Sequence, residues 1–143
     1  MGPRFVDDRG SVLILGIGLV VVCLLAIAVT VDASAAFLQR RALMAIGDAA
    51  ALAGAQAIDL DAYYSNGATP GTRLTPGLVV QAAREHVTHA PAGSRVSIDA
   101  IVTDGTTVIV RLSSPLELPF FSAMATEPVR IESAARLDYR PSA

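Results

Sequence analysis

The hydrophobic and polar positions of this chain divide it into two unequal regions. After a tail of nine residues, Gly10 to Val31 form a run of 22 residues without a charge. As a helix rising ~1.5 Å per residue, this run would be about 33 Å long, enough to cross a hydrocarbon core of ~30 Å. A core helix of a soluble protein rarely stays apolar on every side over such a length. The pattern therefore predicts a transmembrane helix over residues 10–31.

The helical pattern continues past the apolar run. No proline occurs between residues 4 and 69, and Ala dominates residues 32–60, with Leu, Met, Gln and Arg, all of which favour helix. We expect one continuous helix from about Gly10 to about Leu60, on the order of 75 Å long. Small residues recur along its extramembrane part: Gly47, Ala51 and Gly54. Such rows let another backbone approach closely, and the partner is either the chain's own sheet or helices of neighbouring subunits.

The rest of the chain predicts a small α+β domain over residues 78–143, after a loop over 61–77 with three turn signals. Apolar residues at helical spacing predict a short helix from Leu78 to about His89, with Pro76 at its start. Three later segments alternate apolar and polar residues, as strands of an antiparallel sheet with one buried face do: 96–103, 106–112 and 129–138. The expected fold is thus a membrane-anchored α+β protein.

The parity of the apolar positions predicts how the first two strands are joined. A three-residue loop from Thr103 to Gly105 would pair Ala100 with Val108 and so bring the apolar faces together. We expect a type I turn with Gly105 as its left-handed bulge residue.

Large apolar residues also stand in two connecting segments. Phe120, Phe121 and Met124, between the second and third strands, either cap the edge or core of the sheet or contact a partner or the membrane. Tyr63 and Tyr64, in the loop after the long helix, would lie against the sheet or the membrane surface.

Charged side chains near the end of the apolar run are candidate contact residues. Asp32 either marks the water interface or takes part in a contact between helices or subunits. Asp48 lies among small residues and could pair with Arg40 or Arg41 of the same or another chain.

Composition excludes several classes of function. The net charge of −2, without a charge block, gives no indication of nucleic-acid binding, and the single cysteine, Cys23, excludes an internal disulfide. His86 and His89 lack a third ligand at metal-binding spacing, and neither a G-x-S-x-G motif nor a phosphate loop occurs. We therefore expect a protein that is not an enzyme and has no metal, cofactor or small-molecule substrate.

The N-terminal third resembles the TadG/TadE-like proteins of Flp (tight adherence) pilus assembly. The matching features are an Arg-Gly start, an apolar span ending in Val31-Asp32, the triplet Gln39-Arg40-Arg41, and the segment GDAAALAGA over residues 47–55. The resemblance implies a small membrane-anchored component of such a pilus or a related secretion system. Its partners would be membrane lipid and other subunits of that apparatus.

The same resemblance bears on processing. Pilin-like members of the wider group are cut after a glycine and carry Glu as the fifth residue after the cut. A cut between Gly10 and Ser11 would place Leu15 there instead. This difference favours the uncleaved, TadG-like type.

Basic residues are nearly balanced between the two ends of the apolar run, with Arg4 and Arg9 before it and Arg40 and Arg41 after it. The shortness of the tail and the Val- and Thr-rich C-terminal body favour a cytoplasmic N-terminus (residues 1–9) and an extracytoplasmic domain, anchored by a single pass in the cytoplasmic membrane. The alternative is an exported protein with a small extracytoplasmic binding domain. In that case the first segment is a signal that is removed, leaving a chain that begins near Val29 or Ala36.

Overall fold

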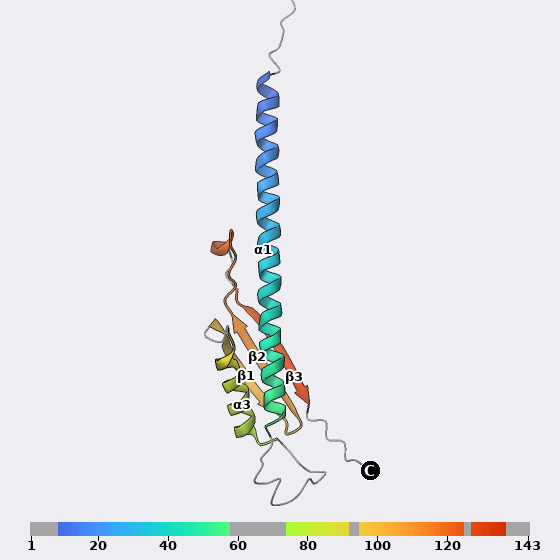
Figure 1. The fold of residues 1–143 in the computed structure, drawn as a ribbon, viewed down its shortest axis with the longest axis vertical. Helices are drawn as coiled ribbons and strands as arrows, with labels where there is room; N and C mark the ends of the chain where they lie inside the picture. Colours follow the sequence, from blue (N-terminus) through green and yellow to red (C-terminus); the bar gives the residue numbers. More distant parts are fainter. Residues whose placement is uncertain (1–8, 58–73, 92–94, 125–126, 137–143) are drawn as a thin grey trace, which may run out of the picture.

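The computed structural model describes residues 9–57, 74–91, 95–124 and 127–136. In chain order its elements are α1 (Arg9–Ala55), α3 (Pro76–His89), β1 (Ser97–Thr103), β2 (Thr107–Ser114), the short 3₁₀ helix η2 (Ser122–Met124) and β3 (Val129–Arg136). Figure 1 shows α1 as a long rod whose later part crosses the sheet, while its earlier part extends away from the other elements. The predicted α+β arrangement of a long apolar helix, a short helix and a three-stranded antiparallel sheet is confirmed.

Helix α1 is continuous from the apolar run into the α+β domain, as predicted, but it ends at Ala55 and not near Leu60. The amide of Gln56 still donates to the carbonyl of Leu52 at 3.0 Å, whereas the amide of Ala57 donates to Gly54 at 3.2 Å. This second bond spans three residues, so the last turn tightens into 3₁₀ geometry, a common way to close a helix. Residues 58–60 lie outside the described residues.

Helix α3 forms where the apolar spacing predicts it. Thr75 is its N-cap residue, and Pro76 occupies the first turn, where a missing N–H costs nothing. Val79, Ala83 and Val87 are buried and lie on one face, since they are spaced by four residues. The helix packs against α1 and β1 with this face.

The three strands form an antiparallel sheet in the order β1-β2-β3. Val110 of β2 pairs with Ser133 of β3, and Leu112 pairs with Ile131. All four of these side chains are buried, which confirms the predicted alternation in β2 and β3.

The predicted register between β1 and β2 is wrong. Thr103 pairs with Val108 and not with an earlier residue, so the strands are joined through residues 104–106 and not through a loop over 103–105. Gly105 does take the expected positive φ, 91°. The carboxylate of Asp104 organises the connection, because it accepts bonds from the amides of Thr106 and Thr107 at 2.8 and 2.7 Å.

A β-bulge explains why simple parity fails in β1. Ile98 pairs with Leu112, but Ala100 pairs with Arg111, so Asp99 is an extra residue in the ladder. An extra residue reverses which side chains face the core beyond it. Val102, predicted to point inward, is therefore 52% exposed.

The hydrophobic core lies between one face of the sheet and the two helices. Its buried members come from α1, α3, β2, β3 and the residue before α3: Leu43, Ala50, Ala51, Ala55, Leu74, Val79, Ala83, Val87, Val108, Val110, Leu112 and Ile131. Strand β1 adds the partly buried Ile98 and Ile101, and the members from α1 all lie in its last 13 residues. The end of α1 is thus an internal element of the α+β domain. The opposite face of the sheet is open to solvent and carries an ion pair between Arg111 and Glu132 at 2.6 Å.

Candidate membrane and assembly site on the long helix

The first half of α1 presents an apolar surface that no other part of the described chain covers. Its large apolar side chains from Val12 to Val31 are between 41% and 75% exposed. The helix is long and apolar enough to cross a membrane, and no residue of its most apolar 18-residue window is buried. Leaving this much apolar area in water would be strongly unfavourable, at roughly 25 cal/mol per Å².

The first charged residue after this surface, Asp32, has an intramolecular partner that the sequence did not indicate. Its side chain is only 5% exposed, although it lies outside the core. Its two carboxylate oxygens each accept a backbone hydrogen bond, from the amide of Phe120 at 3.0 Å and from that of Phe121 at 2.8 Å. A carboxylate that receives two N–H donors makes strong, charge-assisted bonds. Asp32 therefore fixes the β2–β3 connection against α1.

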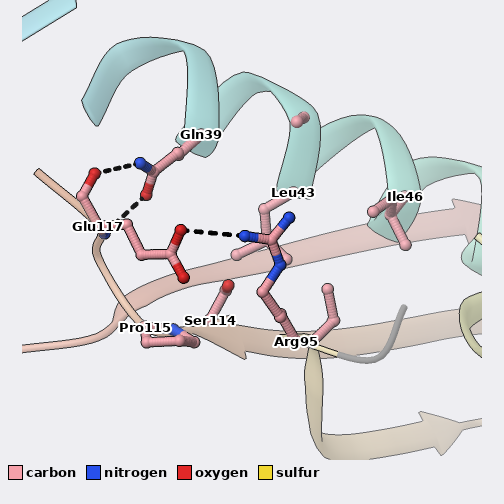
Figure 2. Close-up of a pocket in the computed structure, with 9 residues that line it drawn as sticks. Gln39, Leu43, Ile46, Arg95, Ser114, Pro115 and Glu117 are labelled. Carbon is pink, nitrogen blue, oxygen red and sulfur yellow. Dashed lines mark hydrogen bonds and ion pairs between the residues drawn. The ribbon is translucent and has the colours of Figure 1, made fainter. Parts of the chain in front are cut away.

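A second polar residue of α1 holds the same connection. Gln39 accepts a bond from the amide of Glu117 at 3.0 Å and donates one to the carbonyl of the same residue. The Glu117 carboxylate in turn forms an ion pair with Arg95 at 2.9 Å. Figure 2 shows these groups at the mouth of a cavity of about 280 Å³ between α1 and the end of β2, with Leu43 and Ile46 on its helical side.

The residues of α1 that face the rest of the chain follow one helical line. Positions seven, or alternately four and three, apart share a face of an α-helix. This line runs from the two loop-binding residues into the core: Asp32, Gln39, Leu43, Gly47, Ala50 and Gly54. One face of α1 thus binds the connection at one end and the sheet at the other.

The glycines on this line sit where no side chain would fit freely. A Cβ atom at Gly47 would lie 2.6 Å from Ile131 Cδ1 and 2.7 Å from Ser133 Oγ. At Gly54 the nearest atoms would be Val108 Cγ1 and Val79 Cγ1, both at 3.2 Å. The sequence left open whether these small residues contact the chain's own sheet or helices of neighbouring subunits. In this structure they contact the chain's own sheet and α3.

The candidate contact residues therefore fall into two groups. Asp32, Gly47, Ala51 and Gly54 are covered by their own chain, whereas Arg40, Arg41 and Asp48 are exposed. Across the parts of the chain that the structure describes, the ion pairs are Arg95–Glu117 and Arg111–Glu132, so neither Arg40 nor Arg41 pairs with Asp48. Gly10 and Ser11 lie within α1.

An exposed stripe runs along the outer face of the extramembrane part of α1. Its members are spaced by three or four residues and alternate in chemistry between apolar and charged: Phe37, Arg41, Met44, Asp48 and Leu52. The three apolar members are 65%, 40% and 52% exposed in that order. We call these five residues the outer stripe.

The large apolar residues of the β2–β3 connection are not in the core. Phe120 is 61% exposed and Met124 is 76% exposed. The expectation that they cap the sheet or its core is therefore wrong for these two residues, since the bonds to Asp32 hold the connection beside α1, away from the core. Phe121 is half-buried. Tyr63 and Tyr64 lie outside the described residues.

The remaining candidates for chemistry are isolated. His86 and His89 are exposed on α3, and His89 Nδ1 lies 2.8 Å from the carbonyl oxygen of Glu85. Within residues 9–57, 74–91, 95–124 and 127–136, no group of three His, Cys, Asp or Glu side chains is placed to hold a metal ion. Cys23 is a free thiol on the apolar half of α1.

Sequence reasoning missed the role of Gln39 and the partner of Asp32. One signal was available, because the two residues are seven apart and so share a face of the helix. Their partners left no signal, since backbone amides 88 and 89 residues further along the chain have no signature in the sequence.

The fold and this site place the chain among small proteins in which one long apolar helix extends from an α+β domain. Residues 10–57 match the family model described as Tad, putative Flp pilus-assembly TadE/G-like. The matched segment is about a third of the chain, coincides with α1, and confirms the resemblance drawn from the sequence. Comparisons with curated proteins and with solved structures gave no match.

The family description is that of a component of pilus assembly. The match therefore supports a role related to pilus assembly.

Proposed function

We propose that this protein is a non-enzymatic, single-pass membrane component of an Flp-type pilus-assembly or related secretion apparatus. The tail before α1 lies in the cytoplasm, the apolar half of α1 crosses the cytoplasmic membrane, and the α+β domain lies on the far side. Other subunits of the apparatus bind the extramembrane half of the helix.

The observation that carries this proposal is that the two halves of α1 have different surroundings. Its first half has an apolar surface that the described chain leaves uncovered, while its last 13 residues belong to the core of the domain. Because the helix runs without a break between the two, the domain is held rigidly at a fixed distance from the membrane. A rigid stem of this kind suits a subunit that must present a surface to neighbours in an assembly.

The outer stripe is the surface we assign to those neighbours. Its apolar members supply buried area, and Arg41 and Asp48 supply charges of opposite sign that lie seven residues apart. The buried small residues on the opposite face of α1 are already occupied by the sheet and α3. Contacts with other subunits are thus expected at Arg40, Arg41 and Asp48 and their apolar neighbours.

Membrane anchoring is tested by expression of the full chain in a bacterium, followed by alkaline extraction of membranes and intact mass measurement. We expect the protein in the extracted membrane pellet with residues 1–35 retained. Protease added from the extracytoplasmic side should digest the domain and leave the tail. A soluble product that begins near Val29 or Ala36 would refute the proposal.

The stripe is tested by a photo-crosslinking amino acid placed at Met44, with Val102 as the matched control. Both side chains are exposed and apolar, at 40% and 52%, but Val102 lies on β1, away from α1. Crosslinks to other subunits of the apparatus are expected from position 44 and not from position 102. Equal crosslinking at both positions, or none at position 44, would remove the stripe from the proposal.

The alternative function, an exported protein with a removed signal segment, is less compatible with the contacts of Asp32. A cut before Ala36 would remove the carboxylate that binds the amides of Phe120 and Phe121. A cut before Val29 would keep that carboxylate but remove most of the apolar run that precedes it. The mass measurement above distinguishes all three products.

A further inference from the structure

The β2–β3 connection carries an uncharged apolar tip that serves neither the core nor the outer stripe. Residues 118–126 contain no charge and are bounded by Glu117 and Glu127. Phe120 and Met124 stand out in this segment because they are 61% and 76% exposed. We call residues Leu118–Met124 the tip.

The tip lies at the level of α1 where the apolar run ends. Val31 is the last residue of that run, and the next residue, Asp32, binds the amides of Phe120 and Phe121. Figure 1 shows the connection rising beside α1 from the end of the sheet toward the exposed half of the helix. The tip is therefore continuous with the apolar surface that we assign to the membrane span.

Distances along α1 show how far other polar residues of the helix lie from Asp32. At ~1.5 Å per residue, Gln39 lies about 10 Å beyond Asp32, and Arg41 lies about 13 Å beyond it. The interfacial zone on each side of a bilayer is roughly 5–8 Å thick. With Asp32 at the edge of the hydrocarbon core, the tip falls inside that zone, while the bond between Gln39 and Glu117 falls in water.

Several backbone N–H groups of the tip already have hydrogen-bond partners, as an interfacial, partly apolar environment requires. A polar backbone group without a partner is costly in an apolar environment, by several kcal/mol. Pro119 has no N–H, the amides of Phe120 and Phe121 donate to Asp32, and the amide of Met124 donates to the carbonyl of Phe121 at 2.9 Å. In water the amides of Phe120 and Phe121 could bond to solvent, whereas in an apolar environment they depend on the buried carboxylate of Asp32.

We infer that the tip is a second membrane contact, with Phe120, Phe121 and Met124 inserted in the interfacial zone of the bilayer from which α1 emerges. This inference rests on the proposed membrane span. The membrane span and this lipid contact together hold the protein at two points, so the tilt of the domain relative to the membrane is restricted.

The chain contains no tryptophan, so one introduced Trp is a unique fluorescent reporter. The full chain is reconstituted in phosphatidylcholine and phosphatidylglycerol vesicles, with and without lipids brominated near the headgroup or deep in the acyl chain. Three variants are compared: Phe120→Trp for the tip, Val102→Trp as an exposed control on β1, and Leu15→Trp for the span. Bromine quenches Trp emission only at close range, so it reports the depth of each site.

We expect emission from the Phe120→Trp variant to be blue-shifted relative to that of Val102→Trp. It should also be quenched several-fold more than the control, and more by shallow bromine than by deep bromine. Adding Asp32→Asn to the Phe120→Trp variant should reduce that quenching, because the amide carries no charge and can no longer accept two bonds of the same strength. Leu15→Trp should be quenched mainly by deep bromine.

Quenching of Phe120→Trp no greater than that of Val102→Trp would overturn the inference. A blue shift at position 120 without bromine quenching would also overturn it, because the tip would then be covered by protein. Failure of Leu15→Trp to be quenched would refute the membrane span itself, so the two failures are distinguishable.

Discussion

Substitution of Gly47 tests whether the extramembrane half of α1 is the core helix of the domain. In this structure the residue faces β3, where a Cβ atom would approach Ile131 Cδ1 to 2.6 Å and Ser133 Oγ to 2.7 Å. If the small residues of α1 instead face other subunits, substitution at this position should leave the stability of the isolated protein unchanged or improved. Two variants, Gly47→Ala and Gly47→Leu, separate these outcomes.

The expected magnitudes follow from two opposing effects. Replacing Gly by Ala inside a helix favours folding by about 1 kcal/mol. Overpacking a closed contact costs about 1–3 kcal/mol. Since both nearest atoms are ends of side chains that can shift, while Ser133 Cβ lies at 3.3 Å, we expect Gly47→Ala to lower the free energy of unfolding by roughly 1 kcal/mol. Gly47→Leu should lower it by roughly 3 kcal/mol, because three more carbon atoms find no space.

The assay is urea unfolding of the full chain in detergent micelles, followed by circular dichroism. The micelle preserves the apolar half of α1, so the transition reports the domain. Ala45→Leu is the matched control, since Ala45 lies on the same helix but is exposed. Gly54→Ala should be nearly neutral, because its closest contacts, at 3.2 Å, demand a smaller shift. An unchanged midpoint for Gly47→Leu, or a gain of about 1 kcal/mol for Gly47→Ala, would refute this packing.

Four further outcomes are expected. Asp32→Ala should speed hydrogen exchange at the amides of Phe120 and Phe121, while Asp48→Ala leaves it unchanged. Leu112→Ala, at a fully buried position, should cost about 2–5 kcal/mol of unfolding free energy in the same urea assay. The pKa of Asp104 is lowered from 3.8 to about 2 because Thr107 and Thr106 donate to its carboxylate, so carboxyl NMR should show a midpoint near pH 2. The stabilisation from its charged form is present above about pH 4 and lost as the pH falls toward 2. Asp48→Arg should reduce crosslinking from position 44 without lowering the urea midpoint.

Each of these has a result that would contradict it. Equal exchange at Phe120 in the Asp32→Ala and Asp48→Ala variants would show that the carboxylate does not hold the tip. A Leu112→Ala variant as stable as the natural chain would place β2 outside the core. If Thr106→Ala leaves the pKa of Asp104 unchanged, the turn geometry is wrong. Undiminished crosslinking in the Asp48→Arg variant would exclude this charge from the subunit contact.

The elements of the fold were predictable because their signals are local. An unbroken run of helix-forming residues predicted α1, and apolar residues at helical spacing between Thr75 and Ala90 predicted α3. Alternation predicted β2 and β3, since a strand with one buried face repeats every two residues. These patterns depend only on neighbouring positions, so one sequence was enough.

The register of β1 was not predictable in the same way. Parity assigns faces correctly only while the ladder has no extra residue, and the bulge at Asp99 leaves no mark in the alternation of Val96 to Val102. The Asp99 carboxylate accepts a bond from the hydroxyl of Ser113 at 2.8 Å, on the paired strand. That contact between strands is visible only once the register is known.

The residues of the candidate site also differ in whether the sequence could predict them. The exposed charges of α1, Arg40, Arg41 and Asp48, could be proposed from sequence because charge in a small-residue helix is unusual. The bonds of Asp32 could not, because its partners are backbone amides that any residue other than proline supplies. Local chemistry therefore indicated where a contact would be, but not which segment makes it.

The contacts of Asp32 also change how α1 should be understood as a stem. A helix held in a bilayer only by its own apolar surface has no fixed tilt, because tilt is set by packing and by anchors at the interface. The β2–β3 connection, bound to Asp32 at the edge of the apolar run, supplies such an anchor on one side of the helix. The outer stripe lies on the same continuous helix, so its angle to the membrane depends on that anchor. Loss of the Asp32 carboxylate should therefore weaken subunit crosslinking from Met44, although the two residues do not touch.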